Sequence, residues 1–416
     1  MYFLETKDEG KCCLNNSAVG RTFVSPQLVS AKPVGMLALA LLSALLLAAV
    51  PPAHSQTEKV LYSFVNSPDG ANPRYATPVL DTNRNLYGTT NYGGAYGFGT
   101  VFKLTPSGTK TILHSFDVNG TDGAYPVASL VMYKGNLYGT TVEGGTYNID
   151  GTVFELKHTT LGWTETILHT FGASGDGSQP YCTLTLDTTG NLYGTTYYGG
   201  AHSYGTVFEL TPSGTEKILW SFRNGTDGAN PIAGVVMYNG SLYGTTEYGG
   251  AYGYGTVFKL TPSGTEKILW SFRNGTDGAY PVARLVVYKG NLYGTTANGG
   301  AYGDGTVFEV TLSGAEAILH SFDNNDIDGI NPYAGLVVYN GNLYGTTANG
   351  GGTGSAAGIV FEMSPSGTEK ILHTFGGSPD GSFPWGGVVF DTSGNLYGTT
   401  LSGGHNGVGT VFKLTP

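Results

Sequence analysis

Four polar residues interrupt an otherwise regular sequence and could do acid–base chemistry. They are Arg284, Glu143, Glu247 and His202. In a lyase or hydrolase that degrades polysaccharide, a Tyr or His takes a proton and an Arg stabilises the carboxylate of an acidic sugar. Nothing in the spacing of the four residues brings them together, and a solvated loop position is the favoured interpretation of each. The sequence therefore assigns no catalytic residue.

Tyrosines gather in Gly-rich segments and differ from one segment to the next. The tyrosines predicted to bind a ligand are Tyr96, Tyr198, Tyr204, Tyr248, Tyr252, Tyr254 and Tyr302. Exposed tyrosines beside Asn and Gly suit stacking on sugar rings or contact with a protein partner. The alternative is that these rings cover Gly-rich backbone, and the sequence leaves both interpretations open.

A repeated Asp-Gly-x-x-Pro motif offers carboxylates for cation chemistry. Its aspartates are Asp69, Asp122, Asp176, Asp227, Asp277, Asp328 and Asp380. One interpretation is a ring of carboxylates for Ca²⁺ or for sugar hydroxyls. The favoured one is local: each Asp accepts backbone N–H groups of its own turn, Gly supplies a positive φ, and Pro begins the next strand. The sequence therefore predicts no metal site and no cofactor, with Ca²⁺ as the alternative.

Four histidines share one repeated position, which tryptophan takes in two other copies. These residues are His114, His169, His320 and His373, and Trp220 and Trp270. Equivalent positions on the outside of a ring point away from one another, so we expect them to pack and not to converge on one metal. The motifs G-x-S-x-G, H-E-x-x-H and C-x-x-C are absent from the sequence.

The elements that position these residues come from an internal repeat. The sequence Leu-Tyr-Gly-Thr-Thr begins at Leu86, Leu137, Leu192, Leu242, Leu292, Leu343 and Leu396, at intervals of 50–55 residues. A period near fifty residues indicates a repeat architecture. The motif is interpreted as structural, because a single catalytic centre needs no recurrence. Its mid-strand Gly, such as Gly88, predicts close packing against an aromatic ring of the Phe102 or Tyr87 type.

Each repeat has four β-rich segments and no helical period. In the fifth copy these segments are 282–288, 291–297, 305–311 and 315–322. The first pair and the last pair are joined by short Gly-containing turns, whereas the other two connections are long. Four antiparallel strands in about fifty residues are typical of a β-propeller blade, with a β-solenoid as the main alternative.

The two ends of the repeat region favour the propeller. Residues 57–64 match a fourth strand, and residues 409–416 match a third strand. Pairing these segments closes a ring and removes exposed edges. The sequence thus predicts an all-β, seven-bladed β-propeller of four-stranded antiparallel blades over residues 56–416, closed by the N-terminal strand that completes the last blade.

The topology of such a blade predicts where a ligand binds. The short turns fall on one face of the ring, so the long Gly-rich loops and the Asp-Gly-x-x-Pro loops share the other face, around the central channel. Arg284 replaces a Ser or Gly of other first strands and is expected to project into the channel. We therefore add it to the predicted ligand-binding residues.

The motif from Leu-Tyr-Gly-Thr-Thr through Gly-Thr-Val-Phe-Lys-Leu-Thr-Pro-Ser-Gly-Thr resembles that of the GloVer tandem-repeat family of exported bacterial proteins. The resemblance covers essentially the whole chain after residue 56. It implies an exported, propeller-like repeat protein and supplies no catalytic residues. Members of that family carry one of several surface anchors, whereas this sequence ends at Pro416 without a C-terminal sorting segment.

The first 55 residues are predicted to be a leader with a signal peptide. Residues 36–50 are an apolar run followed by small residues at a cleavage site after Ser55. Export to the periplasm, the cell surface or the medium is expected, without membrane insertion after cleavage. The net charge of −10 argues against nucleic acid and anionic membrane as partners, because both need a basic surface. Cys182 is the only cysteine after the leader, so packing must stabilise the exported chain, which we expect to be a monomer.

Two functions follow from these patterns. The first is a non-catalytic exported binding module or scaffold that holds a glycan or a protein partner on its Tyr- and Gly-rich loop face; the uniform repeats favour it. The second is a polysaccharide-degrading propeller enzyme with its site at the channel mouth. A likeness of fold supports both equally.

Overall fold

The computed structural model describes residues 57–160, 162–325, 327–352 and 357–415. The predicted leader and its cleavage site lie outside these residues. The described chain is built from strands and two short 3-10 turns, η1 (Gly225–Asp227) and η2 (Gly275–Asp277). In these described ranges no helix has the length and apolarity needed to cross a membrane.

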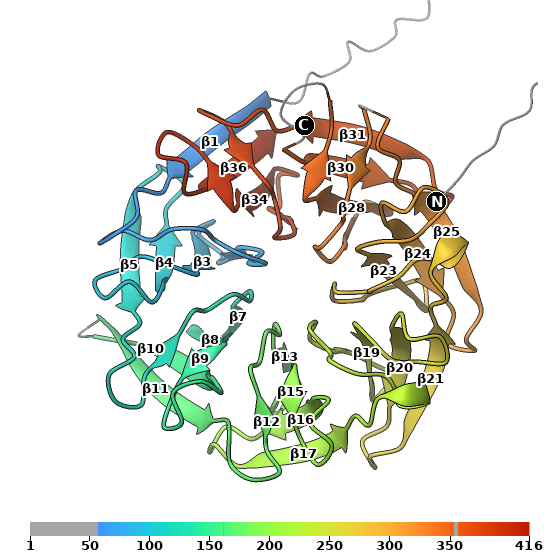
Figure 1. The fold of residues 1–416 in the computed structure, drawn as a ribbon. Coiled ribbons are helices and arrows are strands. Elements are labelled where there is room, and N and C mark those ends of the chain that lie inside the picture. Colours follow the sequence, from blue (N-terminus) through green and yellow to red (C-terminus); the bar gives the residue numbers. More distant parts are fainter. Residues whose placement is uncertain (1–56, 161, 326, 353–356, 416) are drawn as a thin grey trace, which may run out of the picture. The chain divides into compact units, whose positions relative to one another are not determined.

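Seven four-stranded antiparallel sheets are arranged around a central axis, as predicted (Figure 1). Each blade begins with a short inner strand and ends with an outer strand. The first blade consists of β2 (Val79–Leu80), β3 (Leu86–Thr90), β4 (Thr100–Leu104) and β5 (Lys110–Ser115). The second consists of β7 (Val131–Tyr133), β8 (Asn136–Thr141), β10 (Thr152–Thr159) and β11 (Gly162–Thr170). The third consists of β13 (Thr185–Leu186), β14 (Leu192–Thr196), β16 (Thr206–Leu210) and β17 (Glu216–Ser221).

The remaining blades follow the same order. The fourth consists of β18 (Val236–Tyr238), β19 (Ser241–Thr246), β20 (Thr256–Leu260) and β21 (Glu266–Ser271). The fifth consists of β22 (Val286–Tyr288), β23 (Asn291–Thr296), β24 (Thr306–Val310) and β25 (Glu316–Ser321). The sixth consists of β27 (Val337–Tyr339), β28 (Asn342–Thr347), β30 (Ile359–Met363) and β31 (Glu369–Thr374). The seventh consists of β33 (Val389–Phe390), β34 (Leu396–Thr400), β36 (Thr410–Thr415) and β1 (Thr57–Ser63).

The last blade is closed by the first strand of the described chain, which confirms the predicted closure. Strand β1 pairs antiparallel with β36, from Thr57 opposite Thr415 to Ser63 opposite Thr410. The two strands lie side by side at the outer edge of that blade (Figure 1). Hydrogen bonds between distant parts of the sequence therefore complete the ring.

The loop face carries additional short pairings between the two long loops of a blade. Four of these are two-stranded sheets: β6 (Gly123–Ala124) with β9 (Glu143–Gly144), β12 (Gly177–Ser178) with β15 (Tyr198–Gly199), β26 (Gly329–Ile330) with β29 (Asn349–Gly350), and β32 (Gly381–Ser382) with β35 (Ser402–Gly403). In the other three blades, an isolated β-bridge joins the same two loops. These pairings tie the two long loops of each blade together, which fixes the loop residues relative to the channel.

The core lies between blades because both faces of each sheet are buried. In β24, Val307 and Phe308 alternate in direction and are both fully buried. Phe308 packs in the apolar cluster shared with the fourth blade, and Val307 packs with Phe361 in the cluster shared with the sixth. This explains why the Gly-Thr-Val-Phe segment is apolar on both faces.

The repeated mid-strand glycine makes room for the phenylalanine of the neighbouring strand. In all seven blades, a Cβ at this glycine would lie 2.5–2.8 Å from the phenylalanine Cζ. At Gly194, the added Cβ would lie 2.5 Å from Phe208 Cζ and 2.8 Å from Cys182 Sγ. The predicted aromatic contact is therefore confirmed, and the ring is that of the phenylalanine.

Replacement of this glycine by alanine should destabilise the protein. We expect Gly194→Ala to lower the free energy of unfolding by about 1–3 kcal/mol, because a methyl group forced into a packed core displaces its neighbours. Urea denaturation measures the change. Gly376→Ala is the matched control, since no heavy atom of the described residues outside 375–377 lies within 4 Å of its added Cβ. An equal loss in both variants would contradict the packing explanation.

The two threonines of the repeated motif connect strands and blades. The Thr196 hydroxyl lies 2.8 Å from that of Thr206 on the next strand. The Thr195 hydroxyl donates to the Ala233 carbonyl oxygen of the following blade at 3.0 Å. Both side chains are fully buried, so the motif is explained by structural contacts.

Candidate functional site

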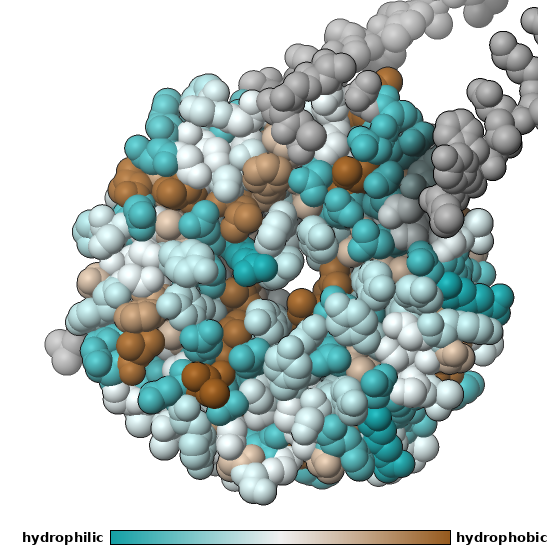
Figure 2. Space-filling model, viewed as in Figure 1, coloured by the Kyte–Doolittle hydropathy of each residue, from teal (hydrophilic) through white to brown (hydrophobic). Residues whose placement is uncertain are grey.

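The central channel is a cavity to which every blade contributes. It has a volume of about 420 Å³ and is lined by the inner strands and the residues that precede them. Figure 2 shows its opening at the centre of the ring. This volume falls within the range of about 300–1,000 Å³ typical of small-molecule sites.

Aromatic side chains surround the entrance of the channel on the loop face. Tyr75, Tyr181, Tyr333 and Trp385 each lie four residues before the inner strand of their blade and line the cavity. The equivalent positions in the other three blades hold Val127, Ile232 and Val282. All four aromatic rings are half-buried. We call these four residues, together with Arg74, the mouth cluster.

The rings of the mouth cluster contact one another across blade boundaries. The Tyr75 ring stacks on Trp385 with centroids 5.4 Å apart. Tyr333 lies 5.5 Å from Trp385 and 6.4 Å from Tyr75. The first, sixth and seventh blades thus present one continuous aromatic surface at the channel entrance.

A cation lies on this aromatic surface. The guanidinium carbon of Arg74 is 5.0 Å from the Trp385 ring centroid and 5.2 Å from that of Tyr75. Such contacts between arginine and aromatic rings are favourable. No carboxylate of the described ranges forms an ion pair with Arg74. Arg74 Nε and Trp385 Nε1 are buried and have no hydrogen-bond partner among the described residues.

Carboxylates and tyrosines of the third and fourth blades lie at the opposite side of the entrance. The Tyr197 hydroxyl donates to Glu247 Oε2 at 2.9 Å, and the Tyr197 ring contacts Tyr181 at 5.6 Å. Burial raises the pKa of the Glu247 carboxyl above its ordinary value. The entrance therefore combines apolar ring faces with hydrogen-bond donors and acceptors.

The tyrosines predicted from the sequence fall into two groups. Tyr198 and Tyr248 lie near the entrance, where the Tyr198 ring contacts Tyr197 at 4.6 Å and the Tyr248 ring contacts Tyr280 at 5.4 Å. Their side chains are exposed.

None of the other five predicted tyrosines makes a ring contact with the mouth cluster among the described residues. Tyr254 is half-buried against Tyr280, and Tyr204 is exposed. Tyr96 lines a separate hollow beside an outer strand, and the Arg273 guanidinium lies 5.1 Å from the Tyr252 ring. Tyr302, at the equivalent loop position, is 61% exposed. The structure therefore does not bring the seven tyrosines into one site.

Arg284 lines the channel, but its guanidinium points away from the mouth cluster. Its Nε donates to the Val235 carbonyl oxygen at 3.2 Å, and its Nη2 donates to Thr185 Oγ1 at 2.7 Å. Arg284 lies two residues before the inner strand of the fifth blade. Val235 lies one residue before the inner strand of the fourth blade, and Thr185 is the first residue of that strand in the third blade. Both partners are therefore closer to the short turns than Arg284 is. Its hydrogen bonds are therefore made to the channel wall of the third and fourth blades.

The remaining catalytic candidates are not gathered into one centre. Burial raises the pKa of Tyr181 and of Tyr75. A nearby carboxylate adds to this shift in each case: Glu143 acts on Tyr181, and Glu247 acts on Tyr75. His202 is exposed and lies near Asp227, outside the channel. Two of the four candidates thus border the entrance, and the other two do not.

The mouth cluster is not among the site residues predicted from the sequence. Its members stand where the repeat varies, directly before the inner strands, and Arg74 belongs to a linker with one more residue than those of the other blades. The change from Val or Ile to Tyr or Trp at one repeated position was the available signal. Only the closed ring shows that these positions meet at the axis.

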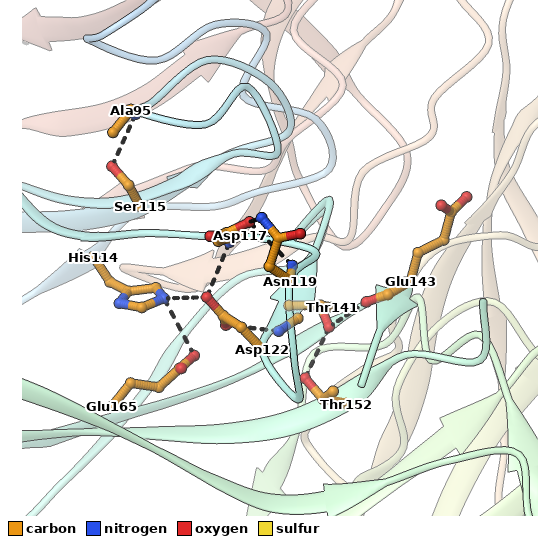
Figure 3. Close-up of polar contacts among 11 residues, drawn as sticks. Ala95, His114, Ser115, Asp117, Asn119, Asp122, Thr141, Glu143, Thr152 and Glu165 are labelled. Carbon is orange, nitrogen blue, oxygen red and sulfur yellow. Dashed lines mark hydrogen bonds and ion pairs between the residues drawn. The ribbon is translucent and has the colours of Figure 1, made fainter. Parts of the chain in front are cut away.

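The aspartates of the Asp-Gly-x-x-Pro motif accept hydrogen bonds from backbone N–H groups of their own turns, as predicted from the sequence. Asp122 Oδ1 accepts from Gly123 N at 2.6 Å, and Oδ2 accepts from Asp117 N at 2.9 Å (Figure 3). The same oxygen lies 3.2 Å from His114 Nε2. The histidines do not meet one another, but each pairs with the aspartate of its own turn.

A residue of the next blade completes each of these outer clusters, which we call the blade junctions. In six junctions it is a glutamate, from Glu165, Glu216, Glu266, Glu316, Glu369 and Glu58. In the seventh it is Lys110, which forms a buried ion pair with Asp69. Lysine thus places an ammonium group in one junction at the position where the other six hold a second carboxyl group.

These glutamates bind protons unusually tightly in the folded state. Burial, followed by the charge of the neighbouring aspartate, raises the pKa of Glu266 to about 8. The same causes raise the pKa of Glu216, Glu316 and Glu369 to about 7 and that of Glu58 to about 6. A carboxyl group whose pKa is raised on folding stabilises the fold fully below its ordinary pKa, and this contribution is lost as the pH rises through the raised value.

The protein should therefore lose stability as the pH rises from 5 to 9. We expect the double variant Glu266→Gln, Glu316→Gln to have nearly the wild-type free energy of unfolding at pH 5. At pH 9 its free energy of unfolding should exceed that of the wild type by roughly 1 kcal/mol per site, because glutamine carries no charge there; this value is reduced to allow for the partial exposure of both side chains. Thermal unfolding in chelator across this pH range measures the effect. Parallel pH profiles for wild type and double variant would contradict it.

These features define the class of protein: a seven-bladed β-propeller with a half-buried aromatic entrance to its channel. The chain belongs to the Gloeobacter/Verrucomicrobia repeat family, whose model matches residues 47–185, 148–296 and 288–416. The resemblance inferred from the repeated motif is thereby confirmed. The comparison with curated proteins finds no match.

Solved structures with a similar fold have very different sequences. The extracellular domain of a putative one-component system from B. thetaiotaomicron matches with a TM-score of 0.54 and 11% identity, over 84% of this chain and 39% of that one. This chain thus spans about two fifths of that structure. A putative 6-phosphogluconolactonase from Bacteroides uniformis matches with a TM-score of 0.49 and 14% identity, over 74% and 86% of the two chains. A putative gluconolactonase matches with a TM-score of 0.43 and 11% identity, over 87% and 92%. The match to the extracellular domain, at 11% identity, shows a shared propeller fold and nothing about function.

Proposed function

We propose that this protein is an exported, non-catalytic binding module that holds an acidic glycan at the channel mouth. The observation that carries the proposal is the mouth cluster, in which a guanidinium without a carboxylate partner lies over two aromatic rings at the entrance of a cavity. The predicted signal peptide supports export, and the family and fold agree with a repeat propeller.

The chemistry of the entrance suits a sugar ring with a carboxylate. Aromatic faces bind the apolar C–H faces of sugars, and Tyr and Trp retain a polar group for hydroxyls. Arginine binds a carboxylate through two parallel N–H donors. Arg74 Nε and Trp385 Nε1 are buried donors without a partner among the described residues, so a small rearrangement of either side chain on binding would give each a ligand oxygen as acceptor.

The arrangement of the catalytic candidates favours binding over catalysis. Arg284 donates to the channel wall, and His202 lies outside the channel. A proton-transfer group must lie within hydrogen-bond reach of the reacting atom, together with the group that stabilises the developing charge. The candidates do not form such a set with one another.

A thermal-shift screen of the purified full chain tests the proposal. Oligosaccharides of galacturonic or glucuronic acid should raise the unfolding midpoint, because a ligand that binds only the folded state stabilises it. Neutral oligosaccharides of equal length should have a smaller effect. Each mixture is also analysed for shortened products and for unsaturated sugars. Cleavage would support the enzyme instead, and no shift with any glycan would point to a protein partner.

A further inference from the structure

The blade junctions that contain histidine have the donor set of a metal site. Three junctions bring one imidazole nitrogen and two carboxylate oxygens within 4.8 Å of one another. These sets are His114, Asp122 and Glu165; His169, Asp176 and Glu216; and His320, Asp328 and Glu369. We propose that each of these three junctions binds a divalent transition-metal ion, with Zn²⁺ as the reference case.

The donor distances at the first of these junctions fit one ion. His114 Nε2 lies 3.2 Å from Asp122 Oδ2 and 3.5 Å from Glu165 Oε1 (Figure 3). Ligands that each lie about 2.0–2.2 Å from a zinc ion are separated from one another by roughly 3.0–3.5 Å. The side chains therefore need little movement to coordinate an ion between them.

The glutamate at this junction directs a buried oxygen toward the histidine. Glu165 Oε1 makes a long ion-pair contact with His114 Nε2 at 3.5 Å and no well-formed hydrogen bond among the described residues. Two carboxylates that approach one another away from water need a proton or a cation between them. At the equivalent place in the first blade, the Lys110 ammonium pairs with Asp69. A positive group is thus already part of one junction.

The residue types favour a transition metal over calcium. Calcium takes oxygen ligands, whereas imidazole with carboxylates suits zinc and its neighbours in the first row. The third junction repeats the pattern, with His320 Nε2 at 3.0 Å from Asp328 Oδ2 and 3.8 Å from a Glu369 oxygen. Beside His114 and Asp122 lies a surface hollow of about 540 Å³, through which water can reach the remaining coordination positions.

The other junctions are controls supplied by the chain itself. Trp220 and Trp270 take the histidine position in two blades, so a tryptophan fits there without loss of the fold. At the fourth histidine, His373 Nε2 lies 3.1 Å from Asp380, but within the described ranges no third donor is close enough to complete the set.

Metal content of the untagged full chain tests the proposal. After equilibration with Zn²⁺ and removal of free ion, the wild type should retain three zinc ions per chain, and each of His114→Trp, His169→Trp and His320→Trp should retain one fewer. The triple variant should retain none, and His373→Trp should retain three. Circular dichroism in chelator establishes that each variant is folded.

Thermal unfolding provides a second measurement. Zn²⁺ should raise the midpoint of the wild type and of His373→Trp, and should leave the triple variant unchanged, while Ca²⁺ should shift none of them. Retention of no zinc by the folded wild type would overturn the proposal. Equal retention by the wild type and the triple variant would overturn it as well.

Discussion

A chain that lacks residues 57–63 is expected to lose the cooperative fold of the propeller. These residues form β1, which covers the edge of β36 and completes the seventh blade. Leu61 and Tyr62 also pack on the apolar cluster that contains Phe102 and Val411, between the last and first blades. Without β1, a strand edge and this core are exposed, and exposed strand edges promote aggregation. Size-exclusion chromatography and thermal unfolding measure the loss.

Relocation of the same strand should restore the fold. In the structure, the start of β1 lies opposite the end of β36, so residue 57 can follow residue 416 through Ser-Gly. This connection reproduces the Thr-Pro-Ser-Gly-Thr turn of residues 211–215. We expect the permuted chain, which begins at residue 64, to unfold cooperatively near the wild-type temperature. A shortened chain as stable as the wild type would contradict closure by β1.

Substitutions in the mouth cluster should have the largest effect on glycan binding. We expect Trp385→Val to weaken binding of an acidic oligosaccharide about tenfold or more, because loss of a buried aromatic contact costs about 1.5–3 kcal/mol. Valine occupies the equivalent position at Val127 and Val282, so the fold should be retained. Isothermal titration calorimetry measures the change.

Arg74→Gln separates charge recognition from ring stacking. It should weaken binding of a uronic-acid oligosaccharide about tenfold, and should change binding of the carboxyl-reduced, neutral form much less, since only the acidic sugar pairs with the guanidinium. Tyr302→Ala is the control, because this exposed ring makes no ring contact with the mouth cluster among the described residues. Equal losses for the acidic and neutral sugars would contradict a role for Arg74 in binding the carboxylate.

Much of the fold could be predicted from the sequence because each blade repeats the same local pattern. The alternation of Val and Phe, the short Gly-containing turns and the mid-strand glycine are local signals that recur seven times. Closure was also predictable, because the first and last segments of the repeat region match complementary strands of one blade.

The candidate site was less predictable because it depends on the positions where the repeat varies. Trp385 and Tyr75 are more than 300 residues apart in the sequence, and they stack only because the ring closes. The same holds for Arg284. Its place in the repeat predicts that it lines the channel, but the orientation of its guanidinium is set by hydrogen-bond acceptors in the third and fourth blades.

The blade junctions show why neighbouring blades must be considered together. The histidine and aspartate of a junction belong to one repeat, but the glutamate lies on the outer strand of the next blade. The spacing of His114 alone indicates packing, and its ring does pack on Phe116. The third donor appears only when the outer strands are placed side by side.

The central claim, that the channel mouth binds an acidic glycan, is tested most directly by the fluorescence of Trp385. In a variant in which Trp163, Trp220 and Trp270 are replaced by Phe, Trp385 is the only tryptophan. The acidic oligosaccharide with the largest thermal shift should change its emission saturably and protect it from iodide quenching. The midpoint should match the calorimetric affinity. Binding by calorimetry with no change in Trp385 emission or quenching would contradict the assignment of the site to the channel mouth.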